Sequence, residues 1–299
     1  MIYPPPLKVG DAVAMIAPSG VVDPQYTDQM CRMLERWGLH VLPGKHLFSE
    51  YGMFAGTAEE RLSDLQQMLD HPEIKAIFCA RGGYGAIHLL DRIVLDNFNK
   101  HPKWVVGYSD ITVLHSLLST AGYCSLHAPM SSHIAAEGED DESVAALKKL
   151  LFGEKQEYHV PAHPLNRNGA CRGKIRGGNL SLLHALRGTA FDLLLNDTIL
   201  FVEDVDEKPY RIERMMYNLK LGKVLKRLKG LIVGKFSGYE EDPLMKMSVY
   251  DSIARLVSEY DYPVCFDFPV GHTKSNYPLV ENGEVLLSVT NTGVRLKYL

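Results

Sequence analysis

The first half of the chain alternates between short apolar runs and segments whose apolar residues recur at helical spacing. The apolar runs at 12–17, 39–42, 74–80 and 104–106 predict strands, and a segment with helical spacing follows each of them. Strands of this kind, separated by helices, are typical of a parallel sheet covered on both faces. The expected fold class is therefore α/β, and ligands of such sheets bind beyond the carboxyl ends of the strands.

Length and composition narrow the class of protein. The 299 residues suffice for two domains, and 46% hydrophobic with 23% charged residues is the balance of a globular protein. A formal net charge of −4 gives no reason to expect a nucleic acid or an anionic membrane as partner. The five cysteines are scattered without a Cys-x-x-Cys pair, so a reducing compartment is predicted, without disulfide framework or zinc ribbon.

No segment predicts a signal peptide, a membrane span or a metal centre. The first residues lack the charged and then apolar pattern of a signal peptide, and no apolar run approaches the length of a membrane span. His159 and His163 have a spacing seen in metal sites, but Pro161 between them argues against a shared helical face. We expect a cytoplasmic protein with no metal and no cofactor.

A change in pattern suggests where the domains meet. The stretch around 158–169 contains prolines and asparagines and has no clear period. We predict an N-terminal domain over 1–155, a linker over 156–170 and a C-terminal domain over 171–299. The last of these ends in a predicted hairpin, 285–290 with 294–298.

Ser109 is the first candidate for chemistry. The stretch 103–118 predicts a buried strand, a sharp turn and a helix, with Ser109 at the turn. A serine at this turn projects beyond the edge of the sheet. The backbone N–H groups at the start of the following helix then point toward the group that the serine attacks. The nucleophile-elbow signature is Gly-x-Ser-x-Gly, whose last position is Ile111 here, so Ser109 or Asp110 also fits as a plain N-cap.

A serine nucleophile needs a base, and the base works better with a carboxylate that orients it. His272 comes shortly after a predicted strand at 263–268, and Glu203 stands where the predicted strand 198–202 ends. Each alone also fits an ordinary surface role, since the chain has 12 histidines and strand ends often carry carboxylates.

The glycine-rich stretch 82–85 follows another predicted strand. Glycines there let the backbone approach a ligand and expose N–H groups. His88 stands where a dinucleotide-binding fingerprint needs its last glycine, and no Gly-Lys-Ser/Thr of a P-loop occurs. An oxyanion donor from the N–H of Gly83 fits this sequence better than a phosphate site.

Five motifs together resemble one known family. They are Ala-Arg-Gly-Gly-Tyr-Gly at 80–85, Gly-Tyr-Ser-Asp-Ile-Thr at 107–112, Arg-Gly-Gly-Asn-Leu at 176–180, Val-Glu-Asp-Val-Asp-Glu-Lys-Pro-Tyr-Arg-Ile-Glu-Arg at 202–214 and Phe-Pro-Val-Gly-His at 268–272. In this order they resemble the LD-carboxypeptidase (muramoyltetrapeptide carboxypeptidase) family of serine peptidases, over nearly the whole chain.

The resemblance implies a catalytic triad and a fold. The family's triad falls on Ser109, Glu203 and His272, and its oxyanion donors fall on the backbone N–H groups of Gly83 and Asp110. The implied fold has an amidotransferase-like (flavodoxin-like) parallel-sheet N-terminal domain that carries the serine. A smaller, swivelling α/β C-terminal domain carries the glutamate and the histidine, and members are usually homodimers.

The resemblance also implies a substrate. The family removes the terminal D-alanine of the murein tetrapeptide, at the bond to the L-centre of the diamino acid, in peptidoglycan recycling. Arg81 is the candidate for binding the terminal carboxylate, although it equally fits as a loop-bracing arginine. Tyr84 in the same loop is the second candidate for substrate binding.

Several alternatives stay open. The microcin C immunity branch of the same family cleaves peptidyl or aminoacyl nucleotides and carries an aromatic loop, whereas Trp37 and Trp104 here fall at core positions. An α/β-hydrolase has the same chain order of serine, acid and histidine. A non-catalytic muropeptide-binding protein would use the glycine loops for binding alone. The choice of Glu203 over its neighbours Asp204 and Glu207 rests on the motif match.

Overall fold

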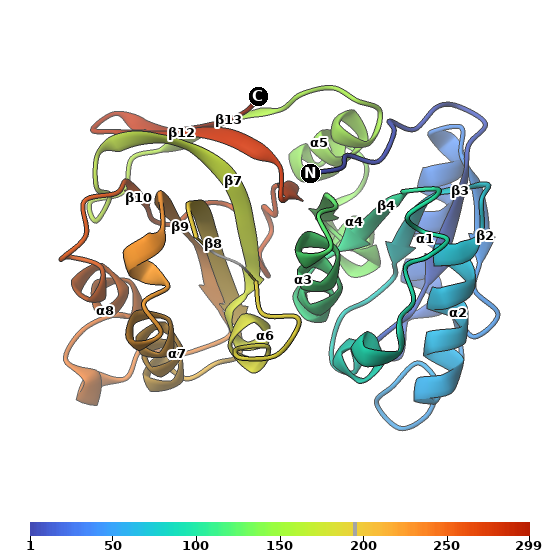
Figure 1. The fold of residues 1–299 in the computed structure, drawn as a ribbon, viewed down its shortest axis with the longest axis horizontal. Helices are drawn as coiled ribbons and strands as arrows, with labels where there is room; N and C mark the ends of the chain where they lie inside the picture. The colour runs from blue at the N-terminus through green and yellow to red at the C-terminus, as the bar shows by residue number, and fades with distance from the viewer. Residues whose placement is uncertain (194–195) are drawn as a thin grey trace. The chain divides into compact units, whose positions relative to one another are not determined.

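The computed structural model describes residues 1–193 and 196–299, which form two compact units (Figure 1). Both are mixed α/β, so the predicted fold class is confirmed. The first unit comprises 1–154 with 277–280, and the second comprises 155–276 with 281–299. The domain limits suggested by the sequence remain a prediction.

The first unit is built on a six-stranded sheet in the order β11-β5-β4-β3-β1-β2. Its strands are β1 (Ala12–Ile16), β2 (His40–Pro43), β3 (Ile74–Cys79), β4 (Trp104–Gly107), β5 (Ser125–His127) and β11 (Leu279–Glu281). The pairs from β2 through β5 are parallel, as the continuous apolar runs predict. The edge strand β11 comes from the C-terminal part of the sequence.

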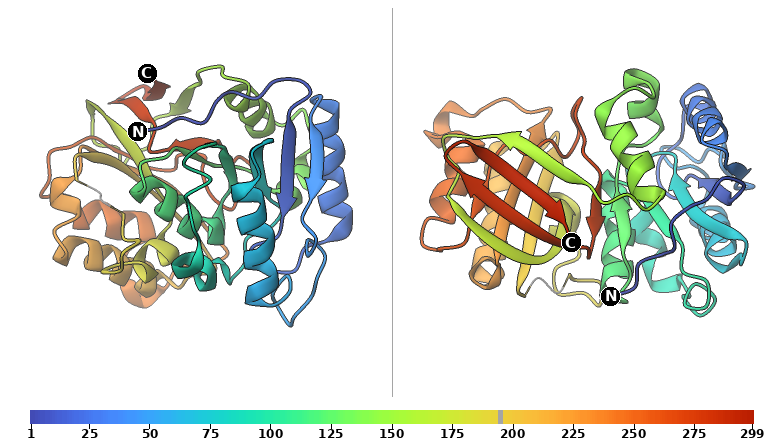
Figure 2. Two further views of the ribbon diagram at one scale, coloured as in Figure 1. Left: turned by 45° about the vertical axis from the view of Figure 1, so that its right-hand side comes forward. Right: turned by 90° about the horizontal axis from the view of Figure 1, so that it is seen from above.

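Helices flank this sheet in two groups (Figure 2). Because β2 and β3 lie on opposite sides of β1, right-handed crossovers place the helix before β2 and the helix before β3 on opposite faces. One group contains α1 (Pro24–Arg36), which packs on α4 (Ser131–Glu137), and the other contains α2 (Ala58–Asp70), the 3₁₀ helix η1 (Ala86–Arg92) and α3 (Thr112–Thr120). The unit also contains the 3₁₀ turn η2 (Ser109–Ile111) and α5 (Glu142–Leu151).

The helix starts follow capping residues that can be read in the sequence. Asp23 accepts hydrogen bonds at the start of α1, and Pro24 occupies the first helical position. Thr57 and Glu60 form a capping box at the start of α2.

The second unit is built on a seven-stranded mixed sheet in the order β10-β9-β8-β7-β12-β13-β6. Its strands are β6 (Glu157–Pro161), β7 (Gly169–Asn179), β8 (Thr198–Val205), β9 (Gly230–Ser237), β10 (Val264–Cys265), β12 (Glu284–Thr290) and β13 (Gly293–Tyr298). Strands β7 to β10 are parallel, and β12 and β13 form the predicted hairpin.

Part of the stretch expected to be a linker forms a strand. Strand β6 lies within 156–170 and pairs with β13 at the edge of the second sheet. Its sequence looks irregular because an edge strand needs only one hydrogen-bonded side and so tolerates Pro161 at its end.

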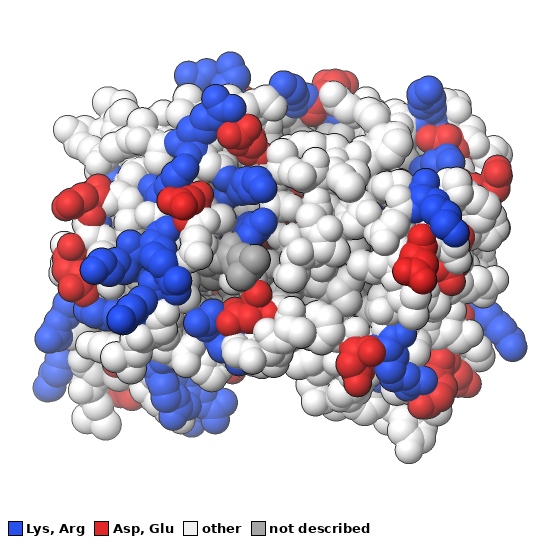
Figure 3. Space-filling view, viewed as in Figure 1, with Lys and Arg blue, Asp and Glu red and all other residues white. Residues whose placement is uncertain are grey.

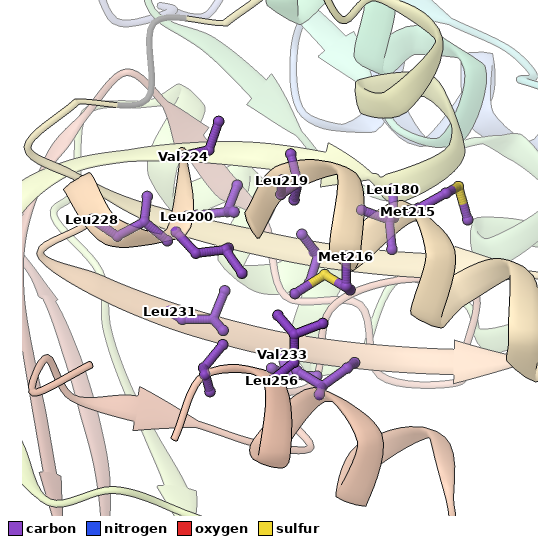
Figure 4. Packing of buried hydrophobic residues seen from close by; sticks show 14 of the residues in the cluster. Leu180, Leu200, Met215, Met216, Leu219, Val224, Leu228, Leu231, Val233 and Leu256 are labelled. Atoms are coloured by element: carbon purple, nitrogen blue, oxygen red, sulfur yellow. The ribbon is translucent and has the colours of Figure 1, made fainter. Parts of the chain in front are cut away.

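The helices of the second unit pack on the sheet through a shared apolar core (Figure 4). They are α6 (Leu180–Ala185), α7 (Pro209–Leu221) and α8 (Val249–Leu256), with the 3₁₀ turns η3 (Leu225–Arg227) and η4 (Pro243–Met245). In Figure 4, Met216 and Leu219 of α7 lie in the same buried cluster as Leu200 of β8 and Leu231 of β9. This packing fixes β8, the strand that carries the predicted triad residue Glu203.

The molecular surface carries both signs of charge. Figure 3 shows acidic and basic side chains interspersed on one face, with basic side chains frequent over the second unit. Within 1–193 and 196–299, no helix has the length and apolar character needed to cross a lipid bilayer.

Candidate active site

Ser109 lies at the turn that the sequence predicts. The four residues of β4 are buried, η2 begins at Ser109, and α3 follows directly. Ser109 has a φ of 64°, a left-handed conformation that is unfavourable for a residue with a side chain. Such strain is characteristic of a nucleophile elbow and is not required of an ordinary N-cap, whose backbone is extended.

The neighbours of the turn explain why a second glycine is not needed. Ile111, at the position where the signature has its last glycine, is fully buried beside Gly107. A Cβ atom on Gly107 would lie 3.0 Å from Cγ1 of Ile111, so it is the glycine before the serine that gives this side chain room. Nε2 of buried His115 donates a hydrogen bond to the carbonyl oxygen of Gly107 at 2.8 Å and thereby braces the turn.

The glycine loop lies beside the serine turn. Strands β3 and β4 are paired, with Phe78 opposite Val106, so the loop after β3 meets the turn after β4. A Cβ atom on Gly82 would lie 2.9 Å from Cβ and 3.1 Å from Oγ of Ser109. Gly83 has a φ of 100°, which glycine adopts without strain. The sheet therefore brings together the predicted nucleophile and the predicted oxyanion loop.

The two predicted substrate-binding residues have different surroundings. Arg81 donates a hydrogen bond from Nη1 to the carbonyl oxygen of Val21, which is the loop-bracing contact considered from the sequence. Tyr84 is 46% exposed, and its hydroxyl lies 3.2 Å from Nε2 of His88. The Tyr84 ring also contacts Phe54, at a centroid distance of 5.8 Å.

The second group of site residues centres on Glu203 and His272. Glu203 lies on β8 and is fully buried, and its Oε2 is 2.8 Å from Nδ1 of His272. Gly271 has a φ of 124°, and a Cβ atom there would lie 2.9 Å from Cβ of Glu203. The histidine can reach the carboxylate only because the residue before it has no side chain. The Glu203 contact orients the ring through Nδ1, as a carboxylate orients a histidine that acts as a general base.

The electrostatics of the pair favour a basic histidine. Burial disfavours the charged imidazolium, but the hydrogen bond and the charge of Glu203 outweigh it, with help from Asp204 and Asp206, and raise the pKa of His272. A carboxylate that stabilises the imidazolium in this way strengthens the base during proton transfer.

The neighbouring carboxylates have other partners. Asp204 accepts hydrogen bonds from Nδ2 of Asn179, at 2.9 Å, and from the backbone and side chain of Ser181. Glu207 also accepts from the Ser181 hydroxyl, at 3.2 Å. Burial raises the pKa of Asp204 to about 6. Glu203 is hydrogen-bonded to His272, and its catalytic role remains a prediction from the motif match.

The role of Asn179 was not apparent from the sequence. It is paired with Glu203 in the register of β7 and β8, and its side chain both caps α6 and binds Asp204. The signal available was its position at a strand end directly before a helical pattern, in the register of the Glu203 strand. It positions the acidic segment next to the pair.

Comparison with known proteins places the chain in a class and a family. Residues 13–128 match the family model described as LD-carboxypeptidase N-terminal domain, and 172–287 match the one described as LD-carboxypeptidase C-terminal domain. The chain is therefore a two-domain α/β peptidase. It belongs to the LD-carboxypeptidase family, which confirms the resemblance seen in the five motifs.

Individual relatives support the same assignment. A probable murein peptide carboxypeptidase of Bacillus subtilis is 38% identical over 237 residues, covering 78% of this chain and 74% of the relative. The crystal structure of a muramoyltetrapeptide carboxypeptidase from Oxalobacter formigenes superimposes with a TM-score of 0.88 at 27% identity, covering 96% of this chain and 98% of that one. The microcin C7 self-immunity protein MccF of Escherichia coli is 24% identical over 303 residues, covering 90% and 88%.

Proposed function

We propose that this protein is a serine L,D-carboxypeptidase that removes the terminal D-alanine from murein tetrapeptide in cytoplasmic peptidoglycan recycling. The observation that carries the proposal is the hydrogen bond between buried Glu203 and His272, in a chain whose Ser109 occupies a strained elbow. Enzymes that catalyse nucleophilic acyl transfer use a serine held at a strained turn together with a histidine that is hydrogen-bonded to a buried carboxylate.

In the proposed reaction the N-terminal domain supplies Ser109 and the C-terminal domain supplies its base. Nε2 of His272 takes the hydroxyl proton while Oγ of Ser109 bonds to the carbonyl carbon of the scissile amide. Glu203 stabilises the imidazolium that forms. The N–H groups of Gly83 and Asp110 donate hydrogen bonds to the oxyanion.

The intermediate then collapses and the C–N bond breaks. His272 returns the proton to the departing amine of D-alanine, which leaves an ester between Ser109 and the remaining tripeptide. His272 next removes a proton from a water molecule that attacks this ester, which releases the tripeptide and the free serine. The reaction consumes one water and requires neither metal nor cofactor.

The murein substrate is preferred because of the relatives and of the aromatic residues. Two of the relatives above are named for murein peptide or muramoyltetrapeptide substrates. The second candidate, cleavage of a peptidyl or aminoacyl nucleotide, is suggested by the relationship to MccF. Against it, Trp37 and Trp104 are 6% and 4% exposed, so neither is free to stack on a nucleobase. A homodimer is proposed from the family alone.

The test is to incubate the protein with murein tetrapeptide and to measure D-alanine release by mass spectrometry. We expect release by the wild type and none by Ser109→Ala. Release by neither protein would reject the murein substrate, and an aminoacyl sulfamoyl nucleotide would then be tried. Equal release by both proteins would reject Ser109 as the nucleophile.

A further inference from the structure

One peptide group in the glycine loop is held at both ends by buried charged side chains. The carbonyl oxygen of Gly85 accepts a hydrogen bond from Nη1 of Arg61 at 2.8 Å. The N–H of the next residue, Ala86, donates to Oδ2 of Asp110, also at 2.8 Å. The cation therefore meets the negative end of the peptide dipole and the carboxylate meets its positive end.

We propose that Arg61 and Asp110 clamp this peptide and that Arg61 is thereby a positioning residue for the oxyanion loop. The proposal rests on the function proposed above for Ser109 and Gly83. The two clamping groups come from α2 and from the residue that follows the nucleophile. The clamp thus ties the orientation of the glycine loop to that of the serine turn.

Arg61 is unusually placed for a charged residue. Its side chain is 2% exposed, and it also donates to the carbonyl oxygens of Pro18, at 2.8 Å, and Gly56, at 3.3 Å. Its guanidinium lies over the ring of Phe54, 5.1 Å from the centroid. Burial lowers the pKa of Arg61, and the charge of Asp110 acts in the opposite direction. Nη2 of Arg61 also lies 3.4 Å from Nδ1 of His88. Neutral partners replace the water around this guanidinium, which is a poor means of gaining stability, so its value lies in the three loops it joins.

The clamp reaches the reacting groups over a short distance along the chain. Gly83, the predicted oxyanion donor, is two residues before the clamped carbonyl, and a Cβ atom on Gly82 would lie against Ser109. Gly85 is needed for the clamp itself, because a Cβ atom there would lie 2.8 Å from Nη1 of Arg61. Rotation of the clamped peptide would turn the preceding N–H groups away from the oxyanion, and oxyanion stabilisation depends on donors held in place beforehand.

The same unit offers a matched control. Lys103 is also a fully buried cation that bonds carbonyl oxygens, those of Met68 and His71 at the end of α2. Neither hydrogen bond of Lys103 involves the glycine loop. Lys103→Met therefore removes a comparable buried charge and leaves the contacts of Arg61 and Asp110 with the loop in place.

The experiment measures how fast a fluorophosphonate probe labels Ser109, and what fraction of the protein is finally labelled, by mass spectrometry. A purely structural role for Arg61 would lower the labelled fraction, whereas a positioning role lowers the rate constant of the labelled molecules. For Arg61→Met we expect a rate constant about 10²-fold below that of the wild type, with the final fraction unchanged. Lys103→Met should keep the wild-type rate constant even if it melts at a lower temperature.

Arg61→Lys covers the case in which Arg61→Met does not fold. Lysine keeps the charge but lacks the planar fork that reaches several carbonyls, so labelling should be about 10-fold slower than in the wild type. A rate constant within about twofold of the wild type in the folded variant, or equal slowing in Lys103→Met, would overturn the clamp. If the wild type is labelled but releases no D-alanine, the murein proposal fails while the labelling rates still decide the clamp.

Discussion

The two units hold their site residues by different means. In the first unit the geometry depends on backbone conformation: Ser109 is left-handed, Gly83 has a positive φ and Gly82 lies against the serine. In the second unit it depends on a hydrogen bond between two side chains, buried Glu203 and partly exposed His272. The first arrangement is therefore sensitive to added atoms, and the second to lost charge.

The largest effect should come from the charge of the second unit. Glu203→Gln keeps the shape but removes the carboxylate that stabilises the imidazolium, so kcat should fall about 10³–10⁴-fold. The base must be neutral to accept a proton, and Glu203 raises the pKa of His272. The acid limb of the kcat/KM profile should therefore move to lower pH in the variant. A profile with an unmoved limb would mean that His272 is not the titrating base.

The matching change in the first unit adds one methyl group. In Gly82→Ala the new Cβ would lie 2.9 Å from Cβ of Ser109 and 3.2 Å from the backbone nitrogen of Asp110. Displacement of the nucleophile should lower kcat about 10²–10³-fold with little change in charge or pH profile. Gly173→Ala is the control, since its Cβ would lie 3.4 Å from the nearest atom and should leave kcat unchanged. Steady-state kinetics of the two variants decide whether close packing matters.

A smaller effect is expected at Arg81. If Arg81 binds the terminal carboxylate of the substrate, Arg81→Met should raise KM about 10-fold and leave kcat nearly unchanged. If its contact with the Val21 carbonyl only braces the loop, kcat should fall instead. Separate measurement of kcat and KM therefore distinguishes the two roles that the sequence left open.

The smallest effect on the rate should come from the core of the second unit. Met216 is fully buried between α7 and the sheet, and Met216→Ala should lower the stability of that unit by about 2–5 kcal/mol. Below the melting temperature, kcat should stay near that of the wild type. Thermal unfolding followed by circular dichroism, with the exposed Leu244→Ala as control, provides the measurement. A large loss of kcat without loss of stability would show that the core also sets the geometry of the Glu203–His272 pair.

The parts of the fold that follow local patterns could be predicted from the sequence. The strand, turn and helix around Ser109 are specified by residues close together in the sequence, and so are the capping box at Thr57 and the hairpin formed by β12 and β13. The contact of Glu203 with His272 could be proposed only from the motif match, because it joins residues far apart in the sequence.

Other features left no local trace. In the sequence, Arg61 is a polar residue within a helical pattern and has no distinguishing feature. Only the fold shows that its guanidinium donates a hydrogen bond to the glycine loop. Strand β6 lacks a pattern because it is an edge strand, and the short β11 returns to the first sheet from a distant part of the chain. The 3₁₀ form of η1 was also not apparent, since its apolar spacing fits an α-helix equally well.

The return of residues 277–280 to the first unit has a consequence for fragments and recombinants of this protein. A fragment that ends at Glu154 would lack β11 and would leave an open edge on β5, available for pairing with other chains. The remaining fragment would carry a strand with no sheet to join. A single crossover between genes near residue 155 would instead pair β5 of one parent with β11 of the other. We expect such recombinants to stay soluble only where the β11 of one parent packs on the β5 edge of the other.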